Sequence, residues 1–275
     1  MTPRKSLAER LDQRLVGQGL VPTRSEAASA IMAGTVLVDG VVVDKPGHRV
    51  RSGAQIQVHA PGHSYVSRGG IKLARALTVF GIDVRGRTAV DLGASTGGFT
   101  DCLLQHGAAR VYAVDVGRGQ LAWSLRTDPR VVPVEGVNAR HLTPAQVGGV
   151  CDLVTADLAF ISLRLVWPTI AGLLAAGGDA VALVKPQFEA GRKQVGHGGV
   201  VRDPSVHESV LRDLADSAAG AGLVPLGLTY SPIAGPAGNI EYLLHLRKPP
   251  AGEAAPLDAA AVVAEAHRKV RRGRS

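Results

Sequence analysis

The sequence predicts an α/β fold with a mostly parallel sheet, preceded by a small α+β module. From residue 71 onward helical and strand-like patterns alternate, which is typical of a parallel sheet with helices on both faces. Before residue 60, two helical stretches are followed by short apolar runs and tight turns, which indicates a separate unit. A chain of 275 residues has room for both.

The small module is expected over residues 1–60. Ser6 and Glu9 have capping-box spacing and leucines recur every four residues, so a helix is predicted over residues 6–17. A second helix is predicted to end at Met32, before Gly34. Short strands are predicted at Val36–Val38, Val41–Val43 and Ile56–Val58. Residues 61–66 have the composition of a linker.

The larger domain is expected over residues 67–248. Its first helix is predicted at Ile71–Phe80. Its strands are predicted at Thr88–Leu92, Val111–Val116, Val131–Val134, Leu153–Ala156, Ala180–Val184, Leu223–Thr229 and Tyr242–Leu246. The glycine-rich, charged segment Gly191–Pro204 breaks this alternation and indicates a long functional loop. Residues 249–275 are interpreted as a linker and a basic C-terminal tail, helical over 258–272.

The formal net charge of +8 favours a nucleic-acid partner, and its distribution is uneven. Residues 1–64 carry +3, residues 65–265 are neutral, and residues 266–275 carry +5. Aromatic residues make up only 4%, which argues against reading single strands by stacking. Two cysteines fit a reducing compartment, and no apolar run approaches the ~18 residues that span a membrane. We therefore expect a cytoplasmic protein without a membrane partner.

A glycine-rich loop follows the strand Thr88–Leu92 and precedes a helix. Its spacing, Gly-x-x-x-Gly-Gly from Gly93, differs from the dinucleotide fingerprint Gly-x-Gly-x-x-Gly. It resembles the S-adenosylmethionine loop of class I methyltransferases, which have a Rossmann-like fold. Asp115, at the end of the next strand, can accept both ribose hydroxyls. A tight turn that binds no ligand is the alternative.

From this resemblance we expect S-adenosylmethionine as the cofactor. The expected contacts are Asp91, Gly93, Ser95, Thr96, Gly97, Gly98, Phe99, Asp115, Val116, Asn138 and Asp157. Two of these positions keep a second interpretation. Asp91 can cap the turn instead of touching the cofactor, and Asn138 can be a turn residue instead of an adenine ligand.

Four charged residues occupy positions that suit proton transfer during catalysis. Asp157 and Lys185 follow strands, at the edge of the sheet where ligands bind in open α/β folds. Lys72 lies in the segment YVSRGGIKL, where the large domain begins, and Glu241 begins its last strand. A surface ion pair is the alternative for any one of them. Together they suit abstraction of a ribose hydroxyl proton by a neutral amine. No metal is expected, because the His and Cys residues lack ligand spacing.

These segments together resemble the TlyA family of rRNA 2′-O-methyltransferases. The resemblance runs from about residue 10 to residue 247. It is carried by YVSRGGIKL, VDLGASTGGFTDCLL, VDVGRGQLAWSLR, TADLAFISL, LVKPQFE, GPAGNIEYLLHL and the N-terminal RLDQRLVGQGLVPTRSEAASAIMAGTVLVDG. The resemblance implies a ribosomal-protein-type RNA-binding domain joined to an FtsJ-like methyltransferase domain. It also implies a catalytic set at Lys72, Asp157, Lys185 and Glu241, with Lys185 as the base.

The resemblance implies methylation of a cytidine ribose in large-subunit rRNA, and the long, basic ends favour the branch that also modifies small-subunit rRNA. The partners would be rRNA or ribosomal subunits, and we expect a monomer. Candidate RNA contacts are Arg10, Arg24, Lys45, Arg68, Arg192 and Lys193. Each of these can also be an ordinary solvated charge.

Three other functions were weighed. A binding-only rRNA or ribosome assembly factor is disfavoured by the intact glycine loop, Asp115 and the four charged residues. A membrane-active haemolysin, a label that this family has carried, is disfavoured by the lack of an apolar or amphipathic anchor. A nicotinamide dehydrogenase is disfavoured by the glycine spacing.

Overall fold

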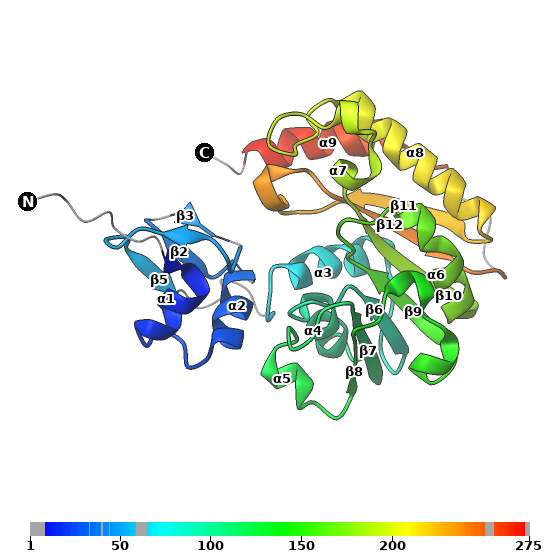
Figure 1. Cartoon of the computed structure of the whole chain (residues 1–275). Coiled ribbons are helices and arrows are strands. Elements are labelled where there is room, and N and C mark those ends of the chain that lie inside the picture. The colour runs from blue at the N-terminus through cyan, green and yellow to red at the C-terminus, as the bar shows by residue number, and fades with distance from the viewer. Residues whose placement is uncertain are drawn as a thin grey trace, which may run out of the picture.

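The protein was described by a computed structural model that covers residues 9–32, 34–39, 41–43, 45–58, 65–250 and 256–272. Most of the predicted linker, residues 61–64, and the last residues of the predicted tail, 273–275, lie outside this part of the chain. The described residues form a small N-terminal module beside a large α/β domain (Figure 1). None of their helices is long and apolar enough to cross a membrane.

The small module packs two helices against short strands. Its helices are α1 (Leu11–Gly17) and α2 (Arg24–Met32). Its strands are β1 (Glu9–Arg10), β2 (Val36–Val38), β3 (Val41–Val42), β4 (Arg49–Val50) and β5 (Ile56–Val58), with β1 paired to β4 and the others in the order β3-β2-β5. Leu11, Leu15 and Ile31 are fully buried between these layers. The module therefore has an apolar core of its own.

The predicted helix over residues 6–17 was wrong at its beginning. Glu9 and Arg10 are extended and pair with Arg49–Val50, so α1 begins at Leu11. The backbone N–H of Leu11 donates to the carbonyl of His48, 2.8 Å away, which joins the chain to the β4 segment before the helix starts. The capping box was thus overridden by non-local strand pairing, and Ser6 itself lies outside the described residues.

The large domain is built on a seven-stranded sheet, which confirms the predicted α/β class. Its strands are β6 (Thr88–Leu92), β7 (Arg110–Asp115), β8 (Val131–Glu135), β9 (Cys151–Ala156), β10 (Leu174–Val184), β11 (Val224–Tyr230) and β12 (Tyr242–Arg247). They stand in the order β11-β12-β10-β9-β6-β7-β8. β12 runs antiparallel to both of its neighbours, and all other neighbouring strands are parallel. The order reverses between β6 and β9, and this is where open α/β sheets bind ligands.

Helices cover both faces of this sheet (Figure 1). One face carries α3 (Gly69–Phe80), α4 (Gly98–Gln105) and the short α5 (Trp123–Arg126); the other carries α6 (Trp167–Leu173), α8 (Pro204–Gly220) and α9 (Ala259–Arg272). Alternate residues of one strand serve opposite faces: Ala89 packs with the first group, whereas Val90 packs with the second. This period of two fixes the register of the sheet.

The chain end contributes to the core of the large domain. Val263 and Ala266 of α9 are almost fully buried against α8 and β11, while Lys269 and Glu265 pair on the exposed side. The small, apolar residues at one helical face explain this packing. The segment interpreted as a tail is therefore a docked amphipathic helix up to Arg272.

The loop expected at 191–204 follows β10 after one short helix, α7 (Pro186–Glu189). It contains a turn of 3-10 helix, Arg192–Gln194, and an antiparallel bridge between Gly196 and Val200. Asp203 caps the following helix, α8, by accepting from the backbone N–H of Ser205. The loop therefore begins beyond the carboxyl end of β10 and is mostly exposed, whereas its Val201 is buried.

The small module contacts the large domain beside the glycine-rich loop. The hydroxyls of Ser25 and Ser29 on α2 donate to the carbonyls of Gly119 and Gln120, at 3.1 and 3.4 Å. Both acceptors lie between β7 and α5. The N-terminal module is therefore held at the same edge of the sheet as the ligand crevice.

Candidate active site

Two adjoining cavities open at the carboxyl ends of β6 and β9. One has a volume of about 750 Å³ and contains the side chains of Lys72, Lys185 and Glu241. The other has a volume of about 820 Å³ and is bounded by Asp115 and Asn138. The lining residues that they share include Met32, Gly93, Ser95, Asp157 and Ala159. Together they form one trough across the point where the strand order reverses.

The glycine loop forms the floor of this trough and needs its glycines. Gly93 has φ of +82°, and a Cβ there would lie 2.5 Å from the carbonyl oxygen of Asp157. Gly97, with φ of +97°, caps α4, and a Cβ there would overlap Leu125. The backbone therefore passes close to its neighbours and leaves the N-terminus of α4 beside the trough.

The structure places most of the predicted cofactor residues along this trough. Ser95, Thr96, Gly98, Phe99 and Asp157 line the first cavity, and Asp115, Val116 and Asn138 line the second. The carboxylate of Asp115 accepts from the backbone N–H groups of Ser95 and Gly117, at 2.8 and 2.7 Å. These bonds fix the carboxylate at the cavity wall, and each oxygen keeps a second lone pair.

Asp91 and Gly97 do not line either cavity. Asp91 is completely buried and accepts from the hydroxyls of Thr100 and Thr155, at 2.7 and 2.9 Å. Burial raises the pKa of Asp91 to about 7, against the lowering effect of these two bonds. Asp91 therefore supports the loop from beneath and does not face either cavity, because its carboxyl ties α4 to β9.

Asn138 is a turn residue that also lines the second cavity. Its side-chain oxygen accepts from the backbone N–H of Arg140 at 3.0 Å and so caps a short 3-10 turn, Ala139–His141. The same residue also lines the second cavity. The turn therefore holds the amide at the cavity wall.

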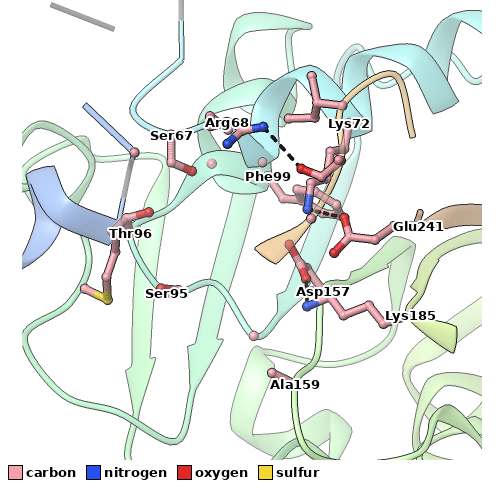
Figure 2. A pocket seen from close by; sticks show the side chains of 18 of the residues that line it. Ser67, Arg68, Lys72, Ser95, Thr96, Phe99, Asp157, Ala159, Lys185 and Glu241 are labelled. Carbon is pink, nitrogen blue, oxygen red and sulfur yellow. Dashed lines mark hydrogen bonds and ion pairs between the residues drawn. The ribbon is translucent and has the colours of Figure 1, made fainter. Parts of the chain in front are cut away.

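Lys72 and Glu241 form a buried ion pair in the first cavity. Lys72 comes from the first turn of α3, Glu241 directly precedes β12, and their charged atoms are 2.5 Å apart (Figure 2). Burial alone would lower the pKa of Lys72, but the negative charges of Glu241 and Asp157 outweigh it and raise that pKa. Lys72 is therefore held as an ammonium ion at neutral pH.

Asp157 and Lys185 form a second pair across the same cavity. Asp157 follows β9, Lys185 follows β10, and the carboxylate lies 2.5 Å from the amino group (Figure 2). Burial would raise the pKa of Asp157, but the charges of Lys185 and Lys72 outweigh it and lower that pKa. Because Asp157 acts on both lysines, the four residues predicted as a set form one continuous group of charges.

The candidate RNA contacts lie in three places. Arg68 is exposed at the mouth of the first cavity, where it donates to the carbonyl of Ala234 at 3.2 Å. Arg192 and Lys193 are exposed on the loop after α7. Arg10, Arg24 and Lys45 lie on the small module. All six positions are wholly or partly exposed.

Arg10 and Arg24 share one buried carboxylate. Asp12 is 3% exposed and accepts from both guanidinium groups, at 2.9 to 3.0 Å. The hydrogen bond from Arg10, with a smaller one from Arg24, lowers the pKa of Asp12 to about 2 against the effect of burial. The two guanidinium groups are thereby held side by side at the surface of the small module.

Sequence reasoning missed several residues of the trough. Met32 reaches both cavities from α2 of the small module, a long-range contact that no local pattern indicates. Gly235 faces Glu241 so closely that a Cβ would overlap its carboxylate. Phe160 is 91% exposed at the rim of the second cavity, with φ of +64°, and its ring lies 5.1 Å from that of Phe188. The unusual GPAGNIEY and ADLAFIS segments were the available signals for the last two.

The comparisons with known proteins agree with this geometry. The profile of FtsJ-like methyltransferases matches residues 65–248, and that of the S4 domain matches residues 9–56. The chain belongs to the TlyA family of FtsJ-like methyltransferases that carry an S4 domain. This confirms the resemblance inferred from the motifs and identifies the small module as the S4 domain and the larger one as the methyltransferase domain.

Several relatives within and around this family are closely similar. The chain is 50% identical over 239 residues to the 16S/23S rRNA (cytidine-2′-O)-methyltransferase TlyA of Mycobacterium tuberculosis, covering 86% of this chain and 89% of that protein. It is 42% identical to Hemolysin A of Brachyspira hyodysenteriae, covering 86% and 98%. A solved structure from Streptococcus thermophilus, described as a hemolysin, is 44% identical with a TM-score of 0.75 and covers 98% of both chains.

Proposed function

We propose that this methyltransferase transfers the methyl group of S-adenosylmethionine to the 2′-hydroxyl of a cytidine ribose in rRNA. The observation that carries the proposal is the paired charge set Lys72–Glu241 and Asp157–Lys185 in a cavity that adjoins the glycine loop. The named activity of the Mycobacterium tuberculosis relative supports the choice of substrate.

The residues of the trough fit the cofactor. Gly93 lets the loop pack against the carbonyl of Asp157, and both residues line the two cavities, so the backbone of the loop faces the trough beside the N-terminus of α4. Asp115 would hold the ribose hydroxyls, and Asn138 would reach the adenine from the wall of the second cavity. When bound, S-adenosylmethionine supplies a methyl group on a positively charged sulfur, and the first cavity lies where the receiving hydroxyl would enter.

Lys185 is the residue best suited to accept the proton of that hydroxyl. Lys72 faces the charges of two carboxylates and is held protonated, whereas Lys185 lies beside Asp157 at the carboxyl ends of β9 and β10. In its neutral form the Lys185 amine takes the ribose proton while the oxygen attacks the methyl carbon. The ammonium of Lys72 stabilises the negative charge that develops on the oxygen, and Glu241 orients Lys72.

The surface around the trough suits a structured RNA. The S4 domain presents the Arg10 and Arg24 guanidinium groups, which match phosphate contacts. Arg192 and Lys193 add two exposed cations on the loop after α7. The exposed ring of Phe160 offers a stacking surface for a base that has left its helix. Shape and phosphate contacts would bring the RNA, and the cavity would select one ribose.

The relative's name gives 16S and 23S rRNA as substrates, and we propose both for this protein as well. The test uses ribosomal subunits from cells that lack this protein, incubated with purified protein and radiolabelled S-adenosylmethionine. Label at a 2′-O-methylated cytidine of either rRNA supports the proposal. Normal binding of the subunits without any label would establish the binding-only alternative instead.

A further inference from the structure

A buried amide joins the connection between β11 and β12, which lines the catalytic cavity, to the loop that follows α7. Asn239 is 3% exposed and lies in the connection between β11 and β12, two residues before Glu241. Its side-chain oxygen accepts from the backbone N–H of Val201 at 3.2 Å, and its amide nitrogen donates to the carbonyl of Gly199 at 3.0 Å. Both bonds reach the loop 191–203, which lies between α7 and α8 (Figure 1).

The backbone of Asn239 acts in the opposite direction, toward the catalytic carboxylate. Its carbonyl accepts from the N–H of Gly235 at 2.9 Å, which closes the connection into a compact turn. Gly235 then lies directly against the carboxylate of Glu241, where a Cβ would overlap it. The position of Gly235, and with it the space left for Glu241, therefore depends on the turn that Asn239 holds.

His207 anchors the same loop from the side of α8. It is fully buried, and its Nε2 lies 3.0 Å from the carbonyl oxygen of Val201. Because a carbonyl can only accept, Nε2 carries the hydrogen of this bond. The peptide groups of Val201 are thus bonded on one side by Asn239 and on the other by His207, so the loop end is fixed at a single buried residue.

We propose that Asn239 is a positioning residue that couples the loop 191–203 to Glu241. Asn239 lines neither cavity, so it would act without touching the substrate or the cofactor. The proposal rests on the proposed function, in which that loop contacts RNA through Arg192 and Lys193 and Glu241 orients Lys72. RNA held by the loop would then be presented to a cavity whose wall is set by the same side chain.

The first test measures how readily trypsin cleaves the loop and does not require enzymatic activity. Arg192, Lys193 and Arg202 are trypsin sites on the loop. Asn239→Ala should raise the rate of cleavage in the loop of the folded protein by about ten-fold, which corresponds to the loss of one or two hydrogen bonds. Val210→Ala, which removes methyl groups from the buried core on α8, is the control for a general loss of stability and should leave loop cleavage unchanged.

The second test separates positioning from structure. With rRNA as substrate, Asn239→Ala should raise KM and lower kcat, each by about ten-fold, while the affinity for S-adenosylhomocysteine stays within about two-fold. Asn239→Asp keeps the acceptor for Val201 and loses the donor to Gly199, so it should give intermediate values if the alanine variant folds poorly. Cleavage and kinetic constants equal to those of Val210→Ala would overturn the proposal. If the wild type transfers no methyl group, the proposed function fails, and the trypsin result still decides whether Asn239 holds the loop.

Discussion

At the scale of single residues, the two lysines of the cavity differ in the charge around them. Lys72 has Glu241 at 2.5 Å and also interacts with Asp157, whereas Lys185 pairs with Asp157. The second carboxylate strengthens the preference of Lys72 for its charged form, because it adds to the attraction of Glu241. In the proposed mechanism Lys72 therefore remains a cation, and Lys185 accepts the proton of the ribose hydroxyl.

Replacing Lys185 by alanine should abolish methyl transfer, with a loss of about 100-fold or more, because the ribose hydroxyl then has no base within reach. The affinity for S-adenosylhomocysteine, measured by calorimetry, should change little, since Lys185 lines the first cavity and Asp115 lines the second. Lys269→Ala removes an exposed lysine of α9 and is the matched control. Turnover close to that of the control would show that Lys185 is not the base.

Gly235 should tolerate no side chain. A Cβ at this position would overlap the Glu241 carboxylate, which is itself buried and paired with Lys72. Gly235→Ala should therefore displace Glu241 and reduce kcat by about ten-fold or more. Gly220→Ala, at the end of α8 where a Cβ meets no atom within 4 Å, is the control and should retain full activity. Equal activity of the two variants would contradict the role given to this contact.

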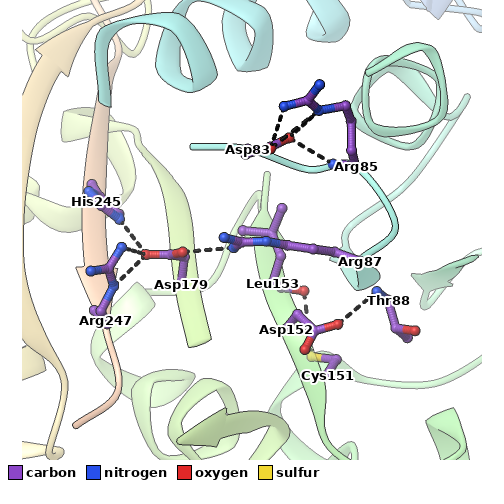
Figure 3. A network of polar contacts seen from close by, with 10 residues as sticks. All are labelled: Asp83, Arg85, Arg87, Thr88, Cys151, Asp152, Leu153, Asp179, His245 and Arg247. Carbon is purple, nitrogen blue, oxygen red and sulfur yellow. Dashed lines mark hydrogen bonds and ion pairs between the residues drawn. The ribbon is translucent and has the colours of Figure 1, made fainter. Parts of the chain in front are cut away.

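At the scale of the elements, one buried carboxylate joins neighbouring strands at the end of the sheet opposite the active site. Asp179 on β10 accepts from Arg87, His245 and Arg247, at 2.7 to 2.9 Å (Figure 3). These hydrogen bonds outweigh burial and lower the pKa of Asp179 to about 2. The network joins β10 to β12 and to the segment before β6, at the opposite edge of the sheet from the active site.

The acid stability of the protein should reflect this network. A carboxyl whose pKa is lowered in the folded state stabilises it above the unfolded pKa of about 4, and the contribution disappears as the pH falls toward 2. Asp179→Asn should lower the free energy of unfolding by about 2 kcal/mol at pH 7, and the difference from wild type should shrink below pH 4. Denaturant titrations across this range measure it. A constant difference at all pH values would show that the loss is only one of packing.

The elements also show how much of the fold could be predicted from the sequence. Strands with continuous apolar runs, such as Thr88–Leu92, were predicted with their observed bounds, because burial on both faces leaves a clear local pattern. The beginning of α1 was mispredicted, because pairing with β4 is set by residues 40 positions away in the sequence. At the site, the rule that ligands bind at the carboxyl ends of strands applies to Asp157 and Lys185, whereas Lys72 comes from the helix α3. No local pattern could show that Met32 of the S4 domain reaches the trough.

At the scale of the whole molecule, the net charge of +8 is distributed unevenly between the domains. The methyltransferase domain balances its charges in internal pairs, whereas the S4 domain holds two arginines at its surface through one carboxylate. Asp12 stays ionised at every physiological pH because its pKa is about 2. In the proposed complex with RNA these arginines are already ordered before binding, so binding costs less side-chain entropy.

Arg24→Gln should therefore weaken rRNA binding without altering chemistry. The variant removes one cation from the S4 domain while Arg10 still satisfies Asp12, so the fold should be retained. KM for rRNA should rise, and kcat at saturating RNA should stay within about two-fold. The slope of log affinity against log salt concentration should become shallower by about 1, which corresponds to the loss of one phosphate contact. Arg85→Gln, an exposed arginine paired with Asp83 before β6, is the control and should leave the salt slope unchanged. An unchanged slope for Arg24→Gln as well would place the RNA on another face of the molecule.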